Sequence, residues 1–232
     1  MSRVHVVMAL ALVAALPACS LAAGLDRFEP ASTGGGSGGG GAGPAGVGGS
    51  GGAAGCATNL LISEARTRGS AGSTDDFVEI VNPTATTVAL TGFKILARSA
   101  SLGDTERTKW TGTTEKLGPG AHLLVAGAGF DDGASPDESL ASNESFGEDT
   151  VLVLRDQNAD VLDTLCLCAF ACADGDWTGC PGDKPISNPN VSQDGVKLDL
   201  DRSLAREPEC SDTDTAEDFV IAPSDAQSTT SP

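Results

Sequence analysis

The chain has 232 residues, with 32 acidic against 14 basic side chains and a formal net charge of −18 at pH 7. A surface this acidic repels phosphate backbones, so we do not expect direct binding to nucleic acid. Aromatic residues make up only 4% of the chain. No long segment repeats apolar residues at helical spacing, so we expect a single all-β domain with a core of Val, Leu and Ile.

Residues 1–18 have the pattern of a secretory processing segment, with Arg3 at the basic end and an apolar run at 6–16. That run is too short to span a membrane permanently. The following LPAC at 16–19 resembles the bacterial lipobox, which implies that Cys19 is lipidated and becomes the new N-terminus. In species that sort lipoproteins by the next position, Ser20 favours the outer membrane. A cleaved, unlipidated and secreted chain is the alternative.

Residues 19–56 are predicted to be a lipidated N-terminus followed by a Gly-rich linker. The stretch 34–55 holds 14 glycines in 22 residues and cannot bury apolar surface. The 37 residues between Cys19 and Cys56 would span roughly 30–36 Å on average as a coil. We interpret this segment as a tether, because the glycines lack the Lys-Ser/Thr pair of a phosphate-binding loop.

The domain is predicted to occupy residues 57–222, starting with a strand at 59–65. Residues 76–83 and 88–97 form two further apolar runs joined by a Thr-rich turn, and we expect two strands there. The second run changes phase at Thr91-Gly92. A bulge at Gly92 would keep all its apolar residues pointing inward.

The middle of the domain is predicted to contain a short strand at 105–113 around Trp110. A turn at 117–120, which includes Gly120, precedes a buried strand at 121–126. Residues 130–149 then form an acidic loop.

The last third is predicted to start with a hairpin of strands 150–154 and 161–165. Residues 166–190 form a Cys-rich insertion around Trp177. Strands are expected at 195–200 and 218–222, and residues 223–232 are expected to be a disordered tail.

Four segments in this order resemble the lamin-tail domain of bacterial exported proteins: LISEA at 61–65, DFVEIVNP at 76–83, LTGF at 90–93 and LGPG at 117–120. DTVL at 149–152 and EDFV at 217–220 extend the resemblance, which covers about 60–222. It implies an immunoglobulin-like β-sandwich that serves as a binding or anchoring module rather than a catalyst. The positions that match the family pattern are given structural roles: Glu64, Asp76, Glu79, Asn82, Gly92 and Gly120. The insertion and the segment after 222 depart from the family pattern.

Six cysteines remain after Cys19: Cys56, Cys166, Cys168, Cys172, Cys180 and Cys210. An even number in an exported chain predicts three disulfides, whose connectivity stays open. Cys166 and Cys168 share one side of an extended strand, so we expect them to have different partners, and we expect the insertion to be joined to Cys56 or Cys210. A zinc site at Cys166, Cys168, Cys172 and Cys180 is the alternative, although their spacing lacks the usual Cys-x2-Cys pairs.

No catalytic residues are assigned. His122 is the only histidine beyond the processing segment, and it lies on an apolar strand, where we interpret it as structural. A Ser-His-Asp triad could be built only around it, and no serine has the glycine pattern of a nucleophile elbow.

Calcium is the only cofactor with any support. Asp131 and Asp132 lie in the acidic loop, and Asp156, Asn158 and Asp160 alternate like the start of a calcium loop. The second group lacks the Gly and the distant Glu of such loops, so we interpret it as the hairpin turn. No metal site is assigned.

Glu64 and Glu79 each lie inside an apolar strand, and a buried carboxylate must be hydrogen-bonded or paired. We expect backbone N–H groups or an arginine, such as Arg98 or Arg202, as their partners.

These patterns together predict a non-catalytic lipoprotein of the cell envelope that binds or anchors an envelope or extracellular protein or glycan. A calcium-dependent adhesion or carbohydrate-binding module is the first alternative. An extracellular hydrolase is the second.

Overall fold

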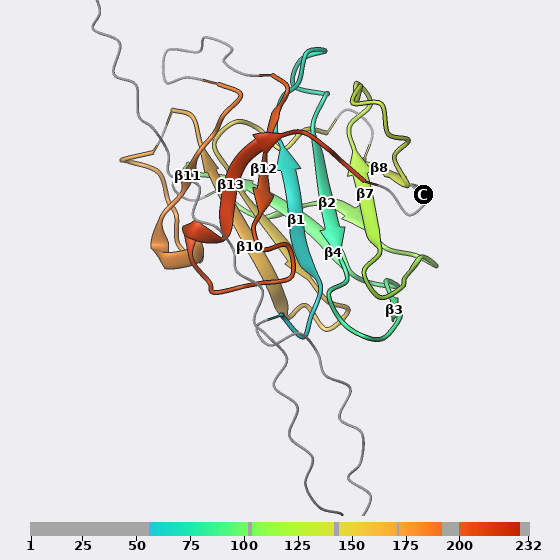
Figure 1. Cartoon of the computed structure of the whole chain (residues 1–232). Coiled ribbons are helices and arrows are strands. Elements are labelled where there is room, and N and C mark those ends of the chain that lie inside the picture. The colour runs from blue at the N-terminus through green and yellow to red at the C-terminus, as the bar shows by residue number, and fades with distance from the viewer. Residues whose placement is uncertain (1–55, 102–103, 142–143, 171, 192–199, 228–232) are drawn as a thin grey trace, which may run out of the picture. The chain divides into compact units, whose positions relative to one another are not determined.

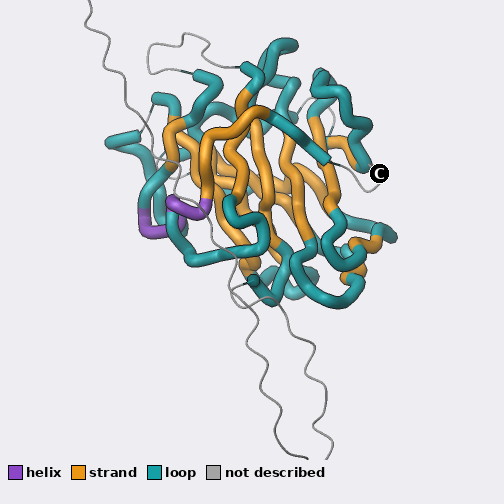
Figure 2. Tube along the Cα trace, in the orientation of Figure 1, coloured by secondary structure: helices purple, strands orange, loops and turns teal. Residues whose placement is uncertain are grey.

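The computed structural model describes residues 56–101, 104–141, 144–170, 172–191 and 200–227. The processing segment, Cys19 and nearly all of the Gly-rich linker lie outside these ranges. The described chain is all-β apart from two 3-10 turns, η1 (Pro181–Asp183) and η2 (Ala216–Asp218), as Figures 1 and 2 show. The all-β class predicted from the sequence is therefore confirmed. Within the described ranges, no helix has the length and apolar character needed to cross a membrane.

The larger sheet has six strands. Their spatial order is β13 (Phe219–Pro223), β12 (Arg202–Arg206), β1 (Leu61–Arg66), β2 (Phe77–Val81), β7 (His122–Ala126) and β8 (Glu138–Ser139). All neighbours are antiparallel except β7 and β8. The two ends of this sheet are strands from the last part of the chain and from the acidic loop.

The second sheet has five strands, and two further strands form a separate small sheet. The order of the five is β11 (Ile186–Ser187), β10 (Val161–Cys168), β9 (Thr150–Arg155), β4 (Lys94–Ser99) and β5 (Arg107–Thr111). The small sheet pairs β3 (Val88–Ala89) with β6 (Lys116–Leu117). The predicted hairpin of 150–154 and 161–165 is confirmed as the antiparallel pair β9 and β10.

The core contains alternate side chains from both large sheets. Val78 and Ile80 of β2 join one buried cluster with Ile95 of β4 and Leu152 and Leu154 of β9. Because side chains alternate along a strand, this cluster uses one face of each sheet, as in a β-sandwich.

A buried ion pair also joins the two sheets. Arg206 of β12 lies 2.6 Å from Asp163 of β10 and donates from Nε to the Ile62 carbonyl oxygen at 2.9 Å. Its guanidinium lies 4.4 Å from the centre of the Phe219 ring. With Asp218 also in range at 3.4 Å, the buried positive charge is paired, as burial requires.

The prediction of one bulged strand over 88–97 is wrong. Residues 88–89 belong to the small sheet and residues 94–99 to the five-stranded sheet, so the chain changes sheets between them. Gly92 lies in the connecting turn with φ at +83°, a conformation that favours glycine, and its N–H donates to the Gly112 carbonyl oxygen. The phase change in the sequence therefore marks a crossover rather than a bulge.

One further prediction falls outside the described residues, and two others need correction. The predicted strand at 195–200 lies outside the described residues except for Leu200, and β12 follows it at 202–206. The acidic loop includes the short strand β8. The predicted disordered tail is structured at its start, because Pro223 ends β13 and residues 224–227 make specific hydrogen bonds described below.

Candidate functional site

The outer face of the six-stranded sheet carries the candidate site. Val78 and Ile80 point into the core, so Glu79 between them points to the opposite face. The chain that leaves β13 crosses this face in front of β1 and β2, as Figure 1 shows. We call this segment, residues 224–227, the C-terminal strap. Its Ala226 packs on an apolar cluster of Phe77, Leu124 and Ala126.

An irregularity in β1 brings two glutamates together. Ile62 pairs with Ile80, whereas Glu64 pairs with Glu79, so Ser63 is an extra residue in β1. Paired residues share a face, and both glutamates are almost completely buried, with 3% and 2% exposure. Two carboxyl groups therefore lie side by side beneath the C-terminal strap.

Backbone N–H groups of the strap donate to both glutamates. Asp225 N donates to Glu64 Oε1 at 3.3 Å, and Gln227 N donates to Glu79 Oε2. Ser63 Oγ donates to Glu79 Oε1. The expected backbone partners are thus confirmed, and among the described residues no ion pair joins either glutamate to an arginine. Arg98 of the five-stranded sheet instead donates to backbone oxygens in the loop of the Cys-rich insertion.

The pKa of Glu64 is strongly raised. Its burial, together with the negative charges of Asp225 and Glu79, raises the pKa of Glu64 from 4.5 to about 8. Glu64 is therefore mainly protonated at neutral pH, which removes the repulsion expected between two directly opposed carboxylates.

His122 lies at the start of β7, beside Glu79. Its Nδ1 is 2.8 Å from Glu79 Oε1, and its Nε2 is 3.4 Å from Glu209 Oε1. Burial works against the charged imidazole, but the hydrogen bond and charge of Glu79, with the charges of Glu209 and Asp225, outweigh it and raise the pKa of His122. The structural role predicted for His122 is supported, since both ring nitrogens face carboxylates.

This arrangement does not form a hydrolytic triad. A nucleophilic serine must contact the histidine, which in turn contacts the acid. Here Ser63 donates to Glu79, and the second nitrogen of His122 faces Glu209. In the described part of the chain, both ring nitrogens of His122 thus face carboxylates, whereas a triad needs a carboxylate on one nitrogen and a serine hydroxyl on the other.

Glu79, His122 and Glu209 form a cluster of metal-ligand type, with their ligand atoms within 4.8 Å of one another. Sequence reasoning did not identify Glu209. It reaches His122 because the adjacent Cys210 is joined to Cys56, just before β1. The disulfide connectivity could not be derived from the sequence, so no local pattern connected Glu209 with this face.

The two groups of calcium candidates lie at opposite ends of the sandwich. Asp132 pairs with Arg66 at the end of β1, and Asp131 N donates to Asp75. Asn59, before the start of β1, instead contacts the Leu162 carbonyl oxygen, next to the 156–160 turn. These five residues therefore cannot form one calcium site.

The segment 156–160 is a hairpin turn, as the sequence predicted. Asp156 Oδ1 accepts from the backbone N–H groups of Asn158 at 2.8 Å and Asp160 at 2.9 Å, and Asn158 Nδ2 donates to Asp156 Oδ2. These contacts use the Asp156 carboxylate to close the turn.

Asn82 connects two turns. Fully buried, it donates from Nδ2 to the carbonyl oxygens of Thr86 and Leu117 at 2.8 Å each and Gly118 at 3.0 Å. Its backbone oxygen accepts from Gly120 N, and Gly120 has φ at +66°. The structural roles predicted for Asn82 and Gly120 agree with these contacts.

Asp76 lies just before β2 and is completely buried. Its Oδ2 accepts from Phe146 N at 2.8 Å, while Oδ1 has no hydrogen-bond partner. Burial raises the pKa of Asp76 from 3.8 to about 7. This residue therefore fixes the end of the acidic loop, in line with its predicted structural role.

The six cysteines form three disulfides: Cys56–Cys210, Cys166–Cys180 and Cys168–Cys172. The prediction that Cys166 and Cys168 have different partners is confirmed. The expectation that a bridge joins the insertion to Cys56 or Cys210 is wrong, because those two pair with each other. The pairing also leaves no thiolate set for the alternative zinc site.

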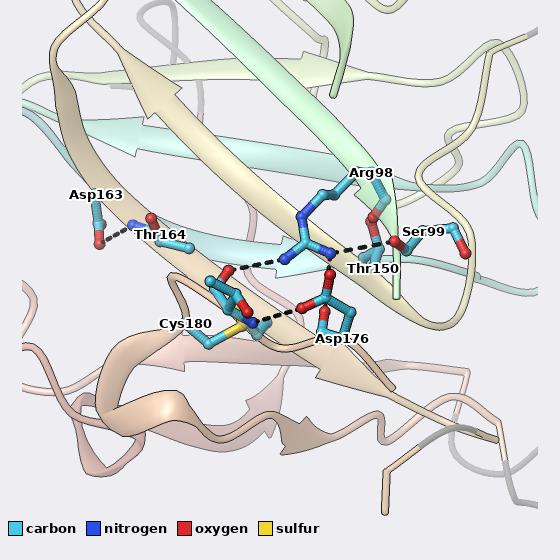
Figure 3. Close-up of a disulfide and its surroundings, with 9 residues drawn as sticks. Arg98, Ser99, Thr150, Asp163, Thr164, Asp176 and Cys180 are labelled. Carbon is cyan, nitrogen blue, oxygen red and sulfur yellow. Dashed lines mark hydrogen bonds between the residues drawn. A yellow bond between two sulfur atoms is a disulfide. The ribbon is translucent and has the colours of Figure 1, made fainter. Parts of the chain in front are cut away.

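The insertion begins later than predicted, because Cys166 and Cys168 belong to β10. Arg98 of β4 binds the middle of the insertion, because it donates hydrogen bonds to the carbonyl oxygens of Asp176 and Thr178 at 2.8 Å each. Figure 3 shows the Arg98 guanidinium directed at the loop that carries Asp176 and Cys180. Two disulfides and one arginine thus fasten this loop to the five-stranded sheet.

Residues 54–166 match the family model of the lamin tail domain. The match supports the family expected from the sequence, and the two packed sheets agree with an immunoglobulin-like sandwich. No curated protein matches the chain.

Proposed function

Taking residues 54–166 as a lamin tail domain, a non-catalytic immunoglobulin-like module, we propose that the protein is a lipoprotein of the cell envelope that binds or anchors another envelope component. Cys19 carries the lipid, the Gly-rich stretch is the tether, and the sandwich is the displayed module. The partner is an envelope or extracellular protein or glycan, and the outer membrane is the proposed location.

The Cys56–Cys210 disulfide is the observation that carries this proposal. The tether ends at Cys56, and Ala57 N also donates to the Cys210 carbonyl oxygen at 2.7 Å. A mechanical force applied along the tether is therefore divided between β1 and, through the disulfide, the segment that joins β12 to β13. Without that bond, the force would act on β1 alone. Disulfides persist in oxidising compartments, which also supports export.

Exposed apolar side chains support a binding role. Val220 and Ile221 lie on β13, at the edge of the six-stranded sheet, and are 38% and 51% exposed. Phe170, in the small loop closed by Cys168–Cys172, is 47% exposed. An edge strand offers backbone groups to a partner strand, and exposed aromatic residues serve as anchors at interfaces.

The two alternatives receive less support. A calcium-dependent module needs six to eight oxygen ligands, and the candidates lie at opposite ends of the sandwich. A serine hydrolase needs a hydroxyl nucleophile in contact with its histidine. In the described residues, the ring nitrogens of His122 face the carboxylates of Glu79 and Glu209 instead.

Two linked measurements test the proposal in a bacterial expression host. First, the wild-type chain should fractionate with membranes, and the Cys19→Ser chain should be released from them. Second, the purified Cys19→Ser chain should bind saturably to isolated cell envelopes and be displaced by an excess of unlabelled chain. If the Cys19→Ser chain stayed with the membranes, the proposed lipid anchor at Cys19 would be wrong. If binding to isolated envelopes were not saturable, the proposed binding role would be wrong.

A further inference from the structure

We propose that His122 and Glu209 form a binding site for a zinc ion, with Glu79 as the residue that positions the imidazole. The ligand atoms are His122 Nε2 and a Glu209 carboxylate oxygen. The site lies on the outer face of the six-stranded sheet and is independent of the lipid anchor.

The orientation of the imidazole is the first argument. Glu79 Oε1 lies 2.8 Å from Nδ1, so Nδ1 keeps its hydrogen and Nε2 offers its lone pair. Carboxylates commonly hold metal-binding histidines in this way. Glu79 is itself fixed by hydrogen bonds from Ser63 Oγ and Gln227 N, so the ring has one preferred orientation.

The spacing of the two ligand atoms is the second argument. Zinc binds imidazole nitrogen and carboxylate oxygen at about 2.0–2.2 Å in tetrahedral geometry, which places two ligand atoms roughly 3.3–3.5 Å apart. His122 Nε2 lies 3.4 Å from Glu209 Oε1. This pair therefore has the separation of two zinc ligands.

The local charge is the third argument. The negative charges of Glu79, Glu209 and Asp225 all act on His122. Among the described residues, no Lys or Arg forms an ion pair with Glu64, Glu79 or Glu209. A divalent cation would neutralise this excess of negative charge.

The combination of one imidazole nitrogen and one carboxylate oxygen favours zinc over calcium. Imidazole suits zinc and related transition metals, whereas calcium takes six to eight oxygens. The Glu209 side chain is 49% exposed, so water can complete the coordination from the solvent side. The Cys56–Cys210 disulfide holds the backbone next to Glu209 and limits the cost of ordering it.

The test uses the full Cys19→Ser chain without a polyhistidine tag, titrated with zinc chloride by calorimetry and followed by NMR of the histidine nitrogens. We expect one zinc ion per chain and a metal-bound Nε2 signal that is absent from His122→Asn. Glu209→Gln should weaken zinc binding at least tenfold. Glu79→Gln should weaken it by about 10–100-fold, as for other residues that orient a metal ligand.

The control is Glu217→Gln, which makes the same charge change at an exposed residue of η2. It should bind zinc like the parent chain. Glu209 is also largely exposed, so Glu209→Gln should remain folded even if His122→Asn does not. Unchanged zinc affinity in Glu209→Gln, or zinc binding that leaves the His122 signals unaltered, would overturn the proposal.

Discussion

Glu64 lies directly opposite Glu79 across β1 and β2, and both carboxyl groups accept hydrogen bonds from the backbone of the C-terminal strap. Opposed glutamates in a sheet normally repel each other. Here the pKa of Glu64 is raised to about 8, so Glu64 is mainly protonated and uncharged at neutral pH. The pair therefore acts as an acceptor site for the strap rather than as a defect in the sheet.

Replacing Glu79 with Ala is expected to lower the melting temperature. The change leaves Ser63 Oγ, His122 Nδ1 and Gln227 N without their common acceptor, and each buried unpaired group costs about 1–3 kcal/mol. Thermal unfolding followed by circular dichroism measures the effect, with the exposed Glu217→Ala as control. Equal melting temperatures for the parent chain and Glu79→Ala would remove the structural role of Glu79.

Asp76 is expected to make the stability depend on pH. Its pKa is about 7 in the folded chain against 3.8 ordinarily, so the folded state binds the extra proton between these values. The stabilisation from this proton is complete below about pH 4 and is lost as the pH rises through 7, at about 1.4 kcal/mol per unit of pKa difference.

Urea unfolding of the parent chain and Asp76→Asn at several pH values checks this prediction. Asn cannot ionise, so the variant should gain stability relative to the parent as the pH rises from 4 to 8. A constant difference between the two chains over that range would show that Asp76 titrates normally.

Gly127 is expected to tolerate no side chain. A Cβ there would lie 2.1 Å from Asp76 Oδ1 and 2.3 Å from the Thr74 carbonyl oxygen. Gly127→Ala should therefore destabilise the domain by about 1–3 kcal/mol or more, as overpacking does. Gly118→Ala is the matched control, because nothing lies within 4 Å of its Cβ position. Similar unfolding midpoints for the two variants would contradict the close approach at Gly127.

The long-range disulfide is expected to contribute most to stability. Cys56–Cys210 joins residues 154 apart in sequence, whereas Cys166–Cys180 joins residues 14 apart. Loop-closure entropy predicts losses of about 5 and about 3 kcal/mol when each pair is replaced by two alanines. Guanidinium unfolding of the two double variants compares these losses. A larger loss for Cys166–Cys180 would contradict the order.

Local patterns predicted the strands that alternate or stay continuously apolar. The run at 76–81, the strand at 121–126 and the hairpin around 156–160 all formed where expected, because propensity and turn residues agree there. The positive φ at Gly120 was likewise signalled by glycine in the predicted turn at 117–120.

Long-range packing determined what the sequence could not predict. Residues 88–89 and 94–99 have similar β propensity, and only their contacts with Leu117 and β9 place them in different sheets. The strand β12 has charged ends, and its Arg206 is buried only because Asp163 and Asp218 reach it from elsewhere. Glu209 approaches His122 through a disulfide whose pairing no local spacing determines.

The most direct test of the lipoprotein account is the intact mass of the protein extracted from membranes, measured with thiol alkylation before and after reduction. We predict a chain that starts at Cys19, carries acyl groups, and has six cysteines that become alkylated only after reduction. A chain without acyl groups, or free thiols before reduction, would contradict the account of a lipid-anchored and disulfide-stabilised domain.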